Sequence, residues 1–503
     1  MQSASLDFKV DRRVAYFHCD DFESVKIDPQ VTPFNPKRYA MTHELLKSLN
    51  LLKWTQRLRP RFLKQHDLSK FHDDQYLRML DQLSLSSPQQ LLSEGRLAQA
   101  SRRCGFLGQS TVHNGAYQFS RGRASGSVGC AEIINSEEIT LAVNFEGGMY
   151  RAKPDQAIGG HFINDVVLCL LTLCEHHSRV LYINVGYEHN DGVEEAFYTS
   201  NNVMCLSFHG NQESGNDQVE RQANVATNSE AEEKEKQESV AAAGAAGAAG
   251  AAASNASTAT VVNEHGKRPA EAVAPATGST VAPLEADNKK LKRETATANN
   301  SNVFSYASIN GTGKQDDIGH GRGLKCTRNV PLPNGLTDAD LNTAFGSIYA
   351  KAIQFYRPNV IVMNVNASSV AGDRGASHWN LSSQGFAPCI GAVRASNLPF
   401  ILLGSGGEHA SNAARTFAAC AAAALGMPTL TGKVPENDAF FEEYQRYGEG
   451  NVGVTASNME NEVNAEALQS MVAGVVEAMS GPALESEGEE EEEEDEEKEE
   501  YEE

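Results

Sequence analysis

The sequence predicts an α/β protein built on a central parallel sheet. Residues 180–185 (VLYINV) and 203–208 (VMCLSF) are short, apolar and rich in β-branched side chains, which is typical of buried strands. Between them, residues 193–198 indicate one or two helical turns. Strand, helix, strand in this order is the βαβ unit of a parallel sheet, and such sheets carry their sites where the strands end. We therefore expect the site at residues 184–191.

The same patterns predict the other elements of one large domain. Residues 163–173 are almost wholly apolar after Asp165, as a helix buried against a sheet would be. We expect strands at 14–17, 139–145, 360–365 and 400–403, and helices at 41–52, 71–83, 117–134, 163–173, 336–355 (capped at Thr337 or Asp338) and 413–424.

Residues 211–302 break this pattern. They hold an Ala/Gly tract at 241–254, long polar and charged stretches, and no cluster of aromatic residues. Such a composition buries too little apolar surface to offset the entropy lost on ordering, so we expect a disordered low-complexity insertion. Two basic clusters within it resemble a bipartite nuclear import signal, and the alternative is an ordinary solvated charge run. The clusters are Lys267 with Arg268, and Lys289, Lys290, Lys292 with Arg293.

The formal charge of −23 is concentrated near the C-terminal end of the sequence. Residues 485–503 hold fifteen acidic residues against one lysine, and we expect residues 474–503 to form a disordered acidic tail. The tail either only adds solubility or binds a basic partner such as histones. So acidic a chain does not suit direct binding to nucleic acid.

Cysteine usage and hydropathy indicate a soluble intracellular protein. The nine cysteines form no CxxC pair, which favours reduced thiols. Residues 1–10 lack the apolar core of a signal peptide, and no apolar run approaches membrane-spanning length. We therefore expect no membrane partner.

Several separate motifs, in one order along the chain, carry a resemblance to class I histone deacetylases. They are MTH (41–43), AVN (142–144), DGVEEAFY (191–198), SFH (207–209), GTG (311–313), DIG (317–319) and GDR (372–374). The resemblance implies the three-layer α/β/α fold shared by arginases and deacetylases, in a discontinuous domain of residues 1–210 and 303–473. It also implies partners in a nuclear deacetylase-type complex, such as an active paralogue.

The resemblance also implies a zinc site, yet other residues stand at its positions. In this family three protein ligands hold zinc, which activates water and polarises the acetyl carbonyl, while a His pair moves protons. The ligand positions fall on Gly186, Glu188 and Ser368, and the His pair falls on Tyr150 and Arg151. Glycine has no side chain, serine is a poor zinc ligand, and neither Tyr nor Arg shuttles protons near neutral pH. We therefore expect no zinc.

The remaining family positions are changed as well. The tyrosine that stabilises the oxyanion falls on Glu408, and the substrate positions fall on Gln109, Gly160 and Ile309. A rebuilt metal site from His161, Glu188, His189 and His409 is the weaker alternative, since neighbouring residues on a strand face opposite ways. Structural potassium remains expected at the family's second, carbonyl-built site, whereas Asn184 and Gly186 replace the carboxylates of the first. The matching potassium positions are Phe197, Ser200, Val203, Ser207 and Phe208.

In place of a metal, we expect an ion pair at the former catalytic centre. In the family the second His is oriented by the residue that matches Asp191, whose partner position here is Arg151. A guanidinium pairs with a carboxylate through two hydrogen bonds, and Glu188 and Glu408 lie close enough in the family's geometry to share its charge. The alternative is that Arg151 points into water.

Three functions follow from these residues. The leading hypothesis is a nuclear pseudo-deacetylase that acts as a scaffold or regulatory subunit in chromatin and transcription regulation. The second is an active protein lysine deacetylase with an unconventional site. The third is a module that binds acyl-lysine or a histone tail without hydrolysing it.

Overall fold

The computed structural model describes residues 13–19, 36–85, 102–106, 110, 112–211, 313–373 and 378–480. Tertiary contacts divide the chain into one unit made of Met1–Gly215 and Phe304–Glu503 and a second unit, Asn216–Val303. The second unit lies outside the described residues, and so do both predicted basic clusters and the tail from residue 481 onward. The described residues form one large domain.

Eight strands form one all-parallel sheet in the order β2-β1-β3-β8-β7-β4-β5-β6. The central strands are almost wholly buried, which explains why they are apolar along their whole length instead of alternating. The strands are β1 (Val14–Phe17), β2 (Gln56–Leu58), β3 (Leu141–Asn144), β4 (Val180–Val185), β5 (Val203–Gly210), β6 (Thr327–Leu332), β7 (Val360–Asn366) and β8 (Phe400–Ser405).

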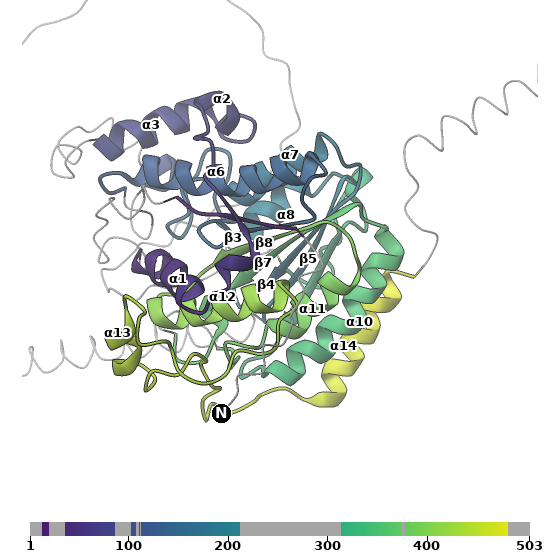
Figure 1. Ribbon diagram of the computed structural model, residues 1–503. Helices are drawn as coiled ribbons and strands as arrows, with labels where there is room; N and C mark the ends of the chain where they lie inside the picture. The colour runs from purple at the N-terminus through teal and green to yellow at the C-terminus, as the bar shows by residue number, and fades with distance from the viewer. Residues whose placement is uncertain are drawn as a thin grey trace, which may run out of the picture. The chain divides into compact units, whose positions relative to one another are not determined.

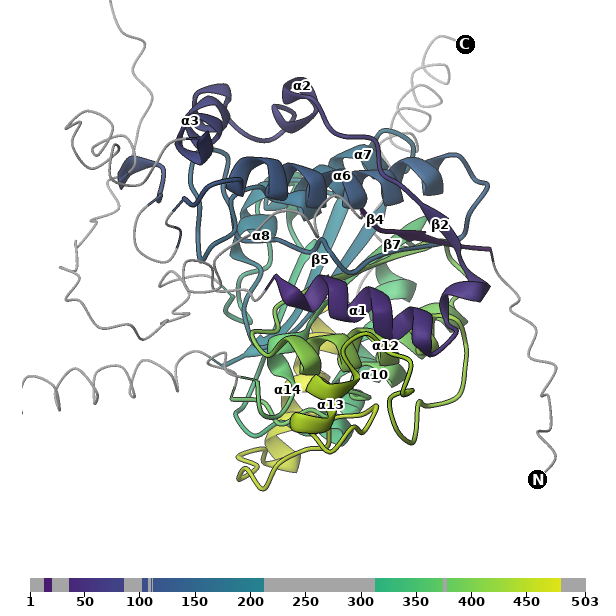
Figure 2. The same cartoon turned by 60° about the vertical axis from the view of Figure 1, so that its left-hand side comes forward.

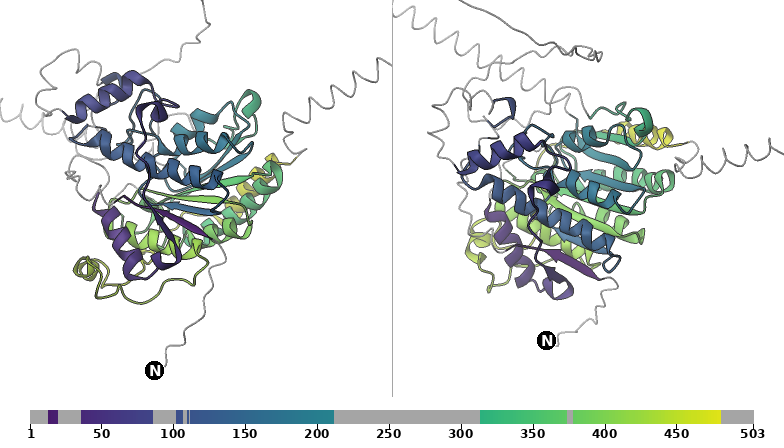
Figure 3. Two further views of the ribbon diagram at one scale, coloured as in Figure 1. Left: turned by 45° about the horizontal axis from the view of Figure 1, so that its top comes forward. Right: turned by 90° about the horizontal axis from the view of Figure 1, so that it is seen from above.

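Helices cover both faces of the sheet and complete the three-layer α/β/α fold (Figure 1). One layer holds α2 (Gln65–Leu68), α3 (Asp74–Leu85), α6 (Ala116–Asn135), α7 (Asp165–Cys174) and α8 (Asp191–Phe197). Seen from above, the blue helices of this layer lie across the sheet (Figure 3). The other layer holds α1 (Lys37–Ser48), α10 (Asp338–Tyr356), α11 (Ala387–Ala395), α12 (Ala410–Ala424), α13 (Phe441–Arg446) and α14 (Ala465–Ala478), and the turned view of Figure 2 shows it below the sheet. Among the described residues, short 3-10 helices also connect elements: η2 (Leu52–Trp54), η4 (Gly321–Gly323) and η5 (Ala367–Ser369).

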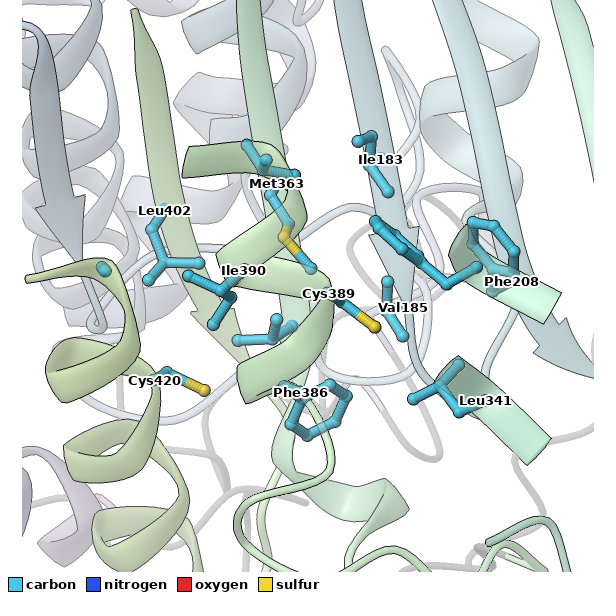
Figure 4. Close-up of a cluster of buried hydrophobic side chains, with 14 of the residues drawn as sticks. Ile183, Val185, Phe208, Leu341, Met363, Phe386, Cys389, Ile390, Leu402 and Cys420 are labelled. Atoms are coloured by element: carbon cyan, nitrogen blue, oxygen red, sulfur yellow. The ribbon is translucent and has the colours of Figure 1, made fainter. Parts of the chain in front are cut away.

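The side chains on the two faces of a central strand belong to two separate apolar clusters. On β4, Leu181, Ile183 and Val185 pack toward the layer that contains α10, α11 and α12. Val180 and Tyr182 point the other way, toward α6 and α7. Figure 4 shows the first cluster, where Ile183 and Val185 face side chains from the helices. No helix in the described part of the chain is both long and apolar enough to cross a membrane.

The predicted strands and helices that fall on described residues are present, with ends that differ by a few residues. The helix expected at 41–52 instead runs from Lys37 to Ser48, because Pro36 occupies its N-cap position and Leu49 its C-cap position. The predicted domain end at residue 473 lies within helix α14 (Ala465–Ala478). Helix α14 runs on to Ala478, because Val475 is still buried against the rest of the domain.

Candidate functional site

Polar side chains meet where β3, β4, β7 and β8 end. Tyr150 and Arg151 follow β3, Glu188 follows β4, Asn366 is the last residue of β7, and Glu408 follows β8. The carboxyl ends of parallel strands lie along one edge of the sheet, and this explains why residues so far apart in sequence come together.

Tyr150, Glu188 and Asn366 form a closed hydrogen-bond network. The Tyr150 hydroxyl donates to Glu188 Oε2 at 2.7 Å, and Asn366 Nδ2 donates to the Tyr150 oxygen at 3.1 Å and to Glu188 Oε2 at 3.4 Å. Tyr150 is fully buried, while Glu188 keeps part of its surface exposed. Burial, and then the neighbouring Glu188 carboxylate, raises the pKa of Tyr150 well above its ordinary value. The tyrosine therefore stays protonated and acts as a donor.

Asn366 fills the space that a side chain at position 186 would need. A Cβ atom added at Gly186 would lie 2.3 Å from the Asn366 Cβ, closer than real Cβ contacts. Asn366 is held in place from its other side, because the Ser368 backbone N–H donates to its Oδ1 at 2.9 Å. A Cβ at Gly406, where φ is +65°, would lie 1.7 Å from the same oxygen. Asn366 is not among the predicted site residues, since its only sequence signal is its place at the end of a buried strand.

Ser368 and Glu408 take part in a second set of hydrogen bonds with the loop after β8. The Ser368 hydroxyl accepts the Gly407 backbone N–H at 2.8 Å, so it ties η5 to that loop. The Glu408 backbone N–H donates to Asp373 Oδ1 at 3.1 Å, and its side chain is partly exposed. Both residues thus lie at the site, with the Ser368 oxygen already engaged by the backbone.

Arg151 and Asp191 are buried together, as the ion-pair hypothesis expects. Their side chains are 4% and 3% exposed, and Arg151 Nε lies 3.5 Å from Asp191 Oδ1. Burial alone would lower the pKa of Arg151, but the Asp191 and Glu188 carboxylates outweigh it and raise that pKa above its ordinary value. The guanidinium is therefore a fixed positive charge, and the alternative in which it extends into water does not hold.

Only one of the three expected substrate positions lies among the described residues. Gly160 is partly exposed, has φ of +78°, and donates its backbone N–H to the Ser110 hydroxyl at 3.0 Å. Gln109 and Ile309 lie outside the described residues.

The histidines weighed for a rebuilt metal site are engaged in separate contacts. His161 accepts the Arg151 backbone N–H at 3.1 Å, and His409 exchanges a hydrogen bond of 3.0 Å with Ser411. His189 lies 3.4 Å from Glu194 and packs its ring on His209. Over the residues that the structure describes, no three His, Cys, Asp or Glu side chains are grouped to hold a metal ion.

The expected potassium positions lie along the end of α8 and the strand β5. Ser200 N donates to the Phe197 carbonyl at 3.0 Å, and Val203 starts the strand that continues through Ser207 and Phe208. At the family's first potassium site, Asn184 Nδ2 donates to the Glu188 carbonyl at 3.2 Å. The Glu188 carbonyl at the first site therefore already accepts a hydrogen bond from a neutral side chain. Potassium binding at the second site stays a prediction.

A row of buried polar side chains crosses the sheet just below these groups. Asn364 Nδ2 donates to Asn184 Oδ1 at 3.3 Å, and Asn329 Nδ2 donates to Glu194 Oε2 at 2.9 Å. Burial raises the pKa of Glu194 to about 8. Across β3, β8, β7, β4, β5 and β6 the paired residues of this row, polar on every strand except β8, are Asn144, Leu403, Asn364, Asn184, Ser207 and Asn329.

The fold and these groups define an α/β protein whose site lies at the carboxyl ends of a parallel sheet. A family model described as the histone deacetylase domain matches residues 32–263 and 300–424. The chain belongs to the class I histone deacetylase family.

Known relatives match most of the chain. It is 30% identical over 483 residues to histone deacetylase 3 of Oryza sativa subsp. japonica, covering 95% of this chain and 74% of the relative. It is 28% identical over 461 residues to type-1 histone deacetylase 1 of Dictyostelium discoideum, covering 92% and 72%. It is 26% identical over 459 residues to human histone deacetylase 1, covering 91% and 73%.

Adding a methyl group at position 186 should destabilise the fold through Asn366. We expect Gly186→Ala to lower the free energy of unfolding by about 2 kcal/mol, because it overpacks a buried contact. In an Asn366→Gly background the same substitution should cost less than about 1 kcal/mol, since the blocking atoms are gone. Urea denaturation of the four proteins of this cycle measures both costs. Equal costs in the two backgrounds would show that Asn366 is not the obstacle.

Removing the Arg151 charge should also destabilise the fold. We expect Arg151→Ala to lower the free energy of unfolding by about 3 kcal/mol, because Asp191 would keep an unpaired buried charge. The double variant Arg151→Ala/Asp191→Asn should recover part of this loss. Arg322→Ala, at an exposed arginine, is the control and should change stability by less than about 0.5 kcal/mol. An Arg151→Ala protein that melts like the control would contradict the prediction.

Proposed function

We propose that this chain is a nuclear histone deacetylase-like protein without deacetylase activity, which acts as a scaffold or regulatory subunit in chromatin and transcription regulation. The observation that carries the proposal is the packing of Asn366 into the space beside Gly186. A ligand side chain at 186 has no room while Asn366 is present, since even its Cβ would lie 2.3 Å from the Asn366 Cβ.

The other two positions also fit zinc poorly. Zinc in proteins is held by cysteine, histidine and carboxylate side chains, in catalytic sites by three of them. Ser368 offers a neutral hydroxyl that already accepts the Gly407 N–H. Glu188 is a carboxylate, but its Oε2 accepts hydrogen bonds from Tyr150 and Asn366. One engaged carboxylate is not a zinc site, so these residues do not fit metal-assisted hydrolysis.

The groups at the former His pair do not supply a general base either. A general base must give up and accept a proton near the working pH. Tyr150 has its pKa raised well above the ordinary value, and the pKa of Arg151 is raised as well. The nearby His161 is buried, has its pKa lowered well below the ordinary value, and accepts the Arg151 N–H. Tyr150 and Arg151 thus keep their protons and His161 stays neutral near neutral pH, so the three groups suit a structural role.

The nuclear part of the proposal rests on the sequence and the relatives. The two basic clusters at 267–268 and 289–293 resemble an import signal in an otherwise acidic chain. Relatives named as histone deacetylases act on a chromatin protein, and the acidic residues 485–503 suit a basic partner such as histones. Partner subunits, such as an active paralogue, would then supply the catalytic activity.

The purified protein should contain no stoichiometric zinc and should not hydrolyse acetyl-lysine. Elemental analysis and a deacetylation assay, run beside an active family member, measure both quantities. Hydroxamates, which act by chelating the family's metal, should leave its melting temperature unchanged. One zinc per chain, lost together with activity on chelation, would overturn the proposal. Tight binding of an acetyl-lysine peptide without turnover would favour the binding-module hypothesis instead.

Deleting residues 212–302 should leave the domain folded but weaken nuclear accumulation. His209 Nε2 lies 2.9 Å from the Gly313 carbonyl and Asn211 N donates to the Leu332 carbonyl at 2.7 Å, so both flanks are fixed within the folded domain. We expect a melting temperature within a few degrees of the full chain and a larger cytoplasmic fraction of a fluorescent fusion. Replacing only Lys289, Lys290, Lys292 and Arg293 by alanine should reproduce the localisation change. Unchanged nuclear accumulation in both variants would contradict the import hypothesis.

A further inference from the structure

A cavity of about 240 Å³ lies in the helical layer of α6 and α7. Its walls come from these two helices and from residues 61–70, which include α2, and Figure 2 shows α2 beside α6 and α7. Glu132 and Glu175, which line it, stand at the ends of α6 and α7 that lead into β3 and β4. They therefore lie toward the edge of the sheet where the strands begin, whereas the candidate site lies where the strands end.

The floor of this cavity is apolar and fixed. Val128 of α6 and Leu168 of α7 line it together with Thr172, and all three are buried. Asn135 Nδ2 donates to the Thr172 carbonyl at 2.8 Å, so it joins the two helices beside the cavity. The volume far exceeds the roughly 15 Å³ that one water molecule needs. The cavity therefore has room for a small organic group.

On one side of the cavity, Arg61 is shared by two carboxylates. Its guanidinium donates to both oxygens of Asp67, at 3.1 and 3.2 Å, and to Glu132 Oε1, at 2.6 and 3.0 Å. One positive charge does not neutralise two negative charges, so an excess negative charge remains here. Both bonds to Glu132 end on Oε1, and its Oε2 accepts no hydrogen bond from the described residues.

On the other side, Lys70 and Glu175 form a neutral pair. Lys70 Nζ donates to Glu175 Oε1 at 2.5 Å, and Oε2 of the same carboxylate accepts no hydrogen bond from any residue that the structure describes. A carboxylate accepts at both of its oxygens, so pairing at one leaves the other able to bind a donor. The side chains of Glu132 and Glu175 are 38% and 50% exposed, which keeps them within reach of a ligand.

The charged side chains around the cavity thus favour a cation. Two basic and three acidic side chains line it, which leaves one net negative charge when the exposed His176 beside them is neutral. The oxygens that remain open are acceptors, and they stand above an apolar floor. A ligand that fits has N–H donors at one end and an apolar body at the other.

We propose that this cavity binds a primary ammonium group on an aliphatic stem, as in the lysine side chain of a basic partner or in a free diamine. The ammonium carries three N–H donors and no acceptor, and it meets Oε2 of Glu132 and of Glu175. The stem lies against Val128 and Leu168, as the stems of lysine side chains commonly lie on apolar surface. This binding activity goes beyond the proposed function and does not depend on it, because the cavity shares no residue with the candidate site.

Photolabelling of the full chain tests for this site. The probe is a short alkylamine with a diazirine in its stem, and mass spectrometry locates the labelled residues. We expect saturable labelling within residues 128–135 or 168–176. The N-acetyl form of the probe, which lacks the charge, should label these residues about fivefold less or weaker still. Label confined to the acidic residues 485–503 would show only a general attraction to negative charge and would overturn the proposal.

Two variants with the same loss of charge provide the comparison. Glu132→Gln/Glu175→Gln removes both carboxylates while nearly keeping their size, and it should lower the labelling about fivefold or more. Glu137→Gln/Glu138→Gln changes two exposed residues just after α6 and should leave the labelling within about twofold. Melting temperatures check that both variants are folded, and Glu175→Gln alone replaces the double variant if that protein melts early. Equal labelling of the two variants would overturn the proposal.

Competition against the photoprobe separates the two sources of the ammonium group. An unacetylated lysine-rich peptide that displaces the probe at about tenfold lower concentration than 1,5-diaminopentane would assign the cavity to a protein lysine. The reverse order would assign it to a free diamine, and either order supports the site. Displacement by neither compound, or equal displacement by neutral 1-pentanol, would contradict binding of an ammonium group.

Discussion

Coverage of both faces of the parallel sheet by helices is the constraint on which the rest of the structure depends. Side chains on both faces of β4 are buried in apolar clusters, so the middle of the strand has no place for a charged group. On β4, β5, β7 and β8 the buried Asn, Ser and His side chains lie near the carboxyl end of the strand or in the row below the site. The site is therefore built from residues that follow strands, and each of them needs a hydrogen-bond partner.

Neutral asparagine side chains supply most of the hydrogen-bond partners of these site residues. Asn184 and Asn364 bond to each other across β4 and β7, and Asn366 joins Tyr150 to Glu188. A buried amide with partners costs little, whereas a buried charge is tolerated only with a counter-charge. In this centre, the buried positive charge of Arg151 has its counter-charge in the Asp191 carboxylate. The arrangement resembles a packed polar core more closely than a site that waits for a ligand.

Much of the fold could be predicted because burial leaves a clear pattern in the sequence. The ends of β4 follow from its apolar run, and the Thr337 cap marks the start of α10, where its side chain accepts the Asp340 N–H. Strand β2 was not predicted, because its residues Gln56 to Leu58 are largely exposed and lack the apolar signal. The family resemblance implied that Tyr150 and Glu188 lie close together, because both stand at positions of the family's catalytic centre. The role of Asn366 was not implied by it, because asparagine at the end of a strand is typical of ordinary turns and the sequence does not show which neighbour it contacts.

The contact between Gly186 and Asn366 also restricts how the chain could change over evolutionary time. Any path of single substitutions that places a larger side chain at 186 meets the Asn366 Cβ first. The viable order begins at 366, where the change alone opens space without supplying a ligand. A substitution at 366 alone creates no metal site, so selection for metal binding would not favour it. The contact between Gly186 and Asn366 thus makes it hard for single substitutions to return a metal ligand to position 186.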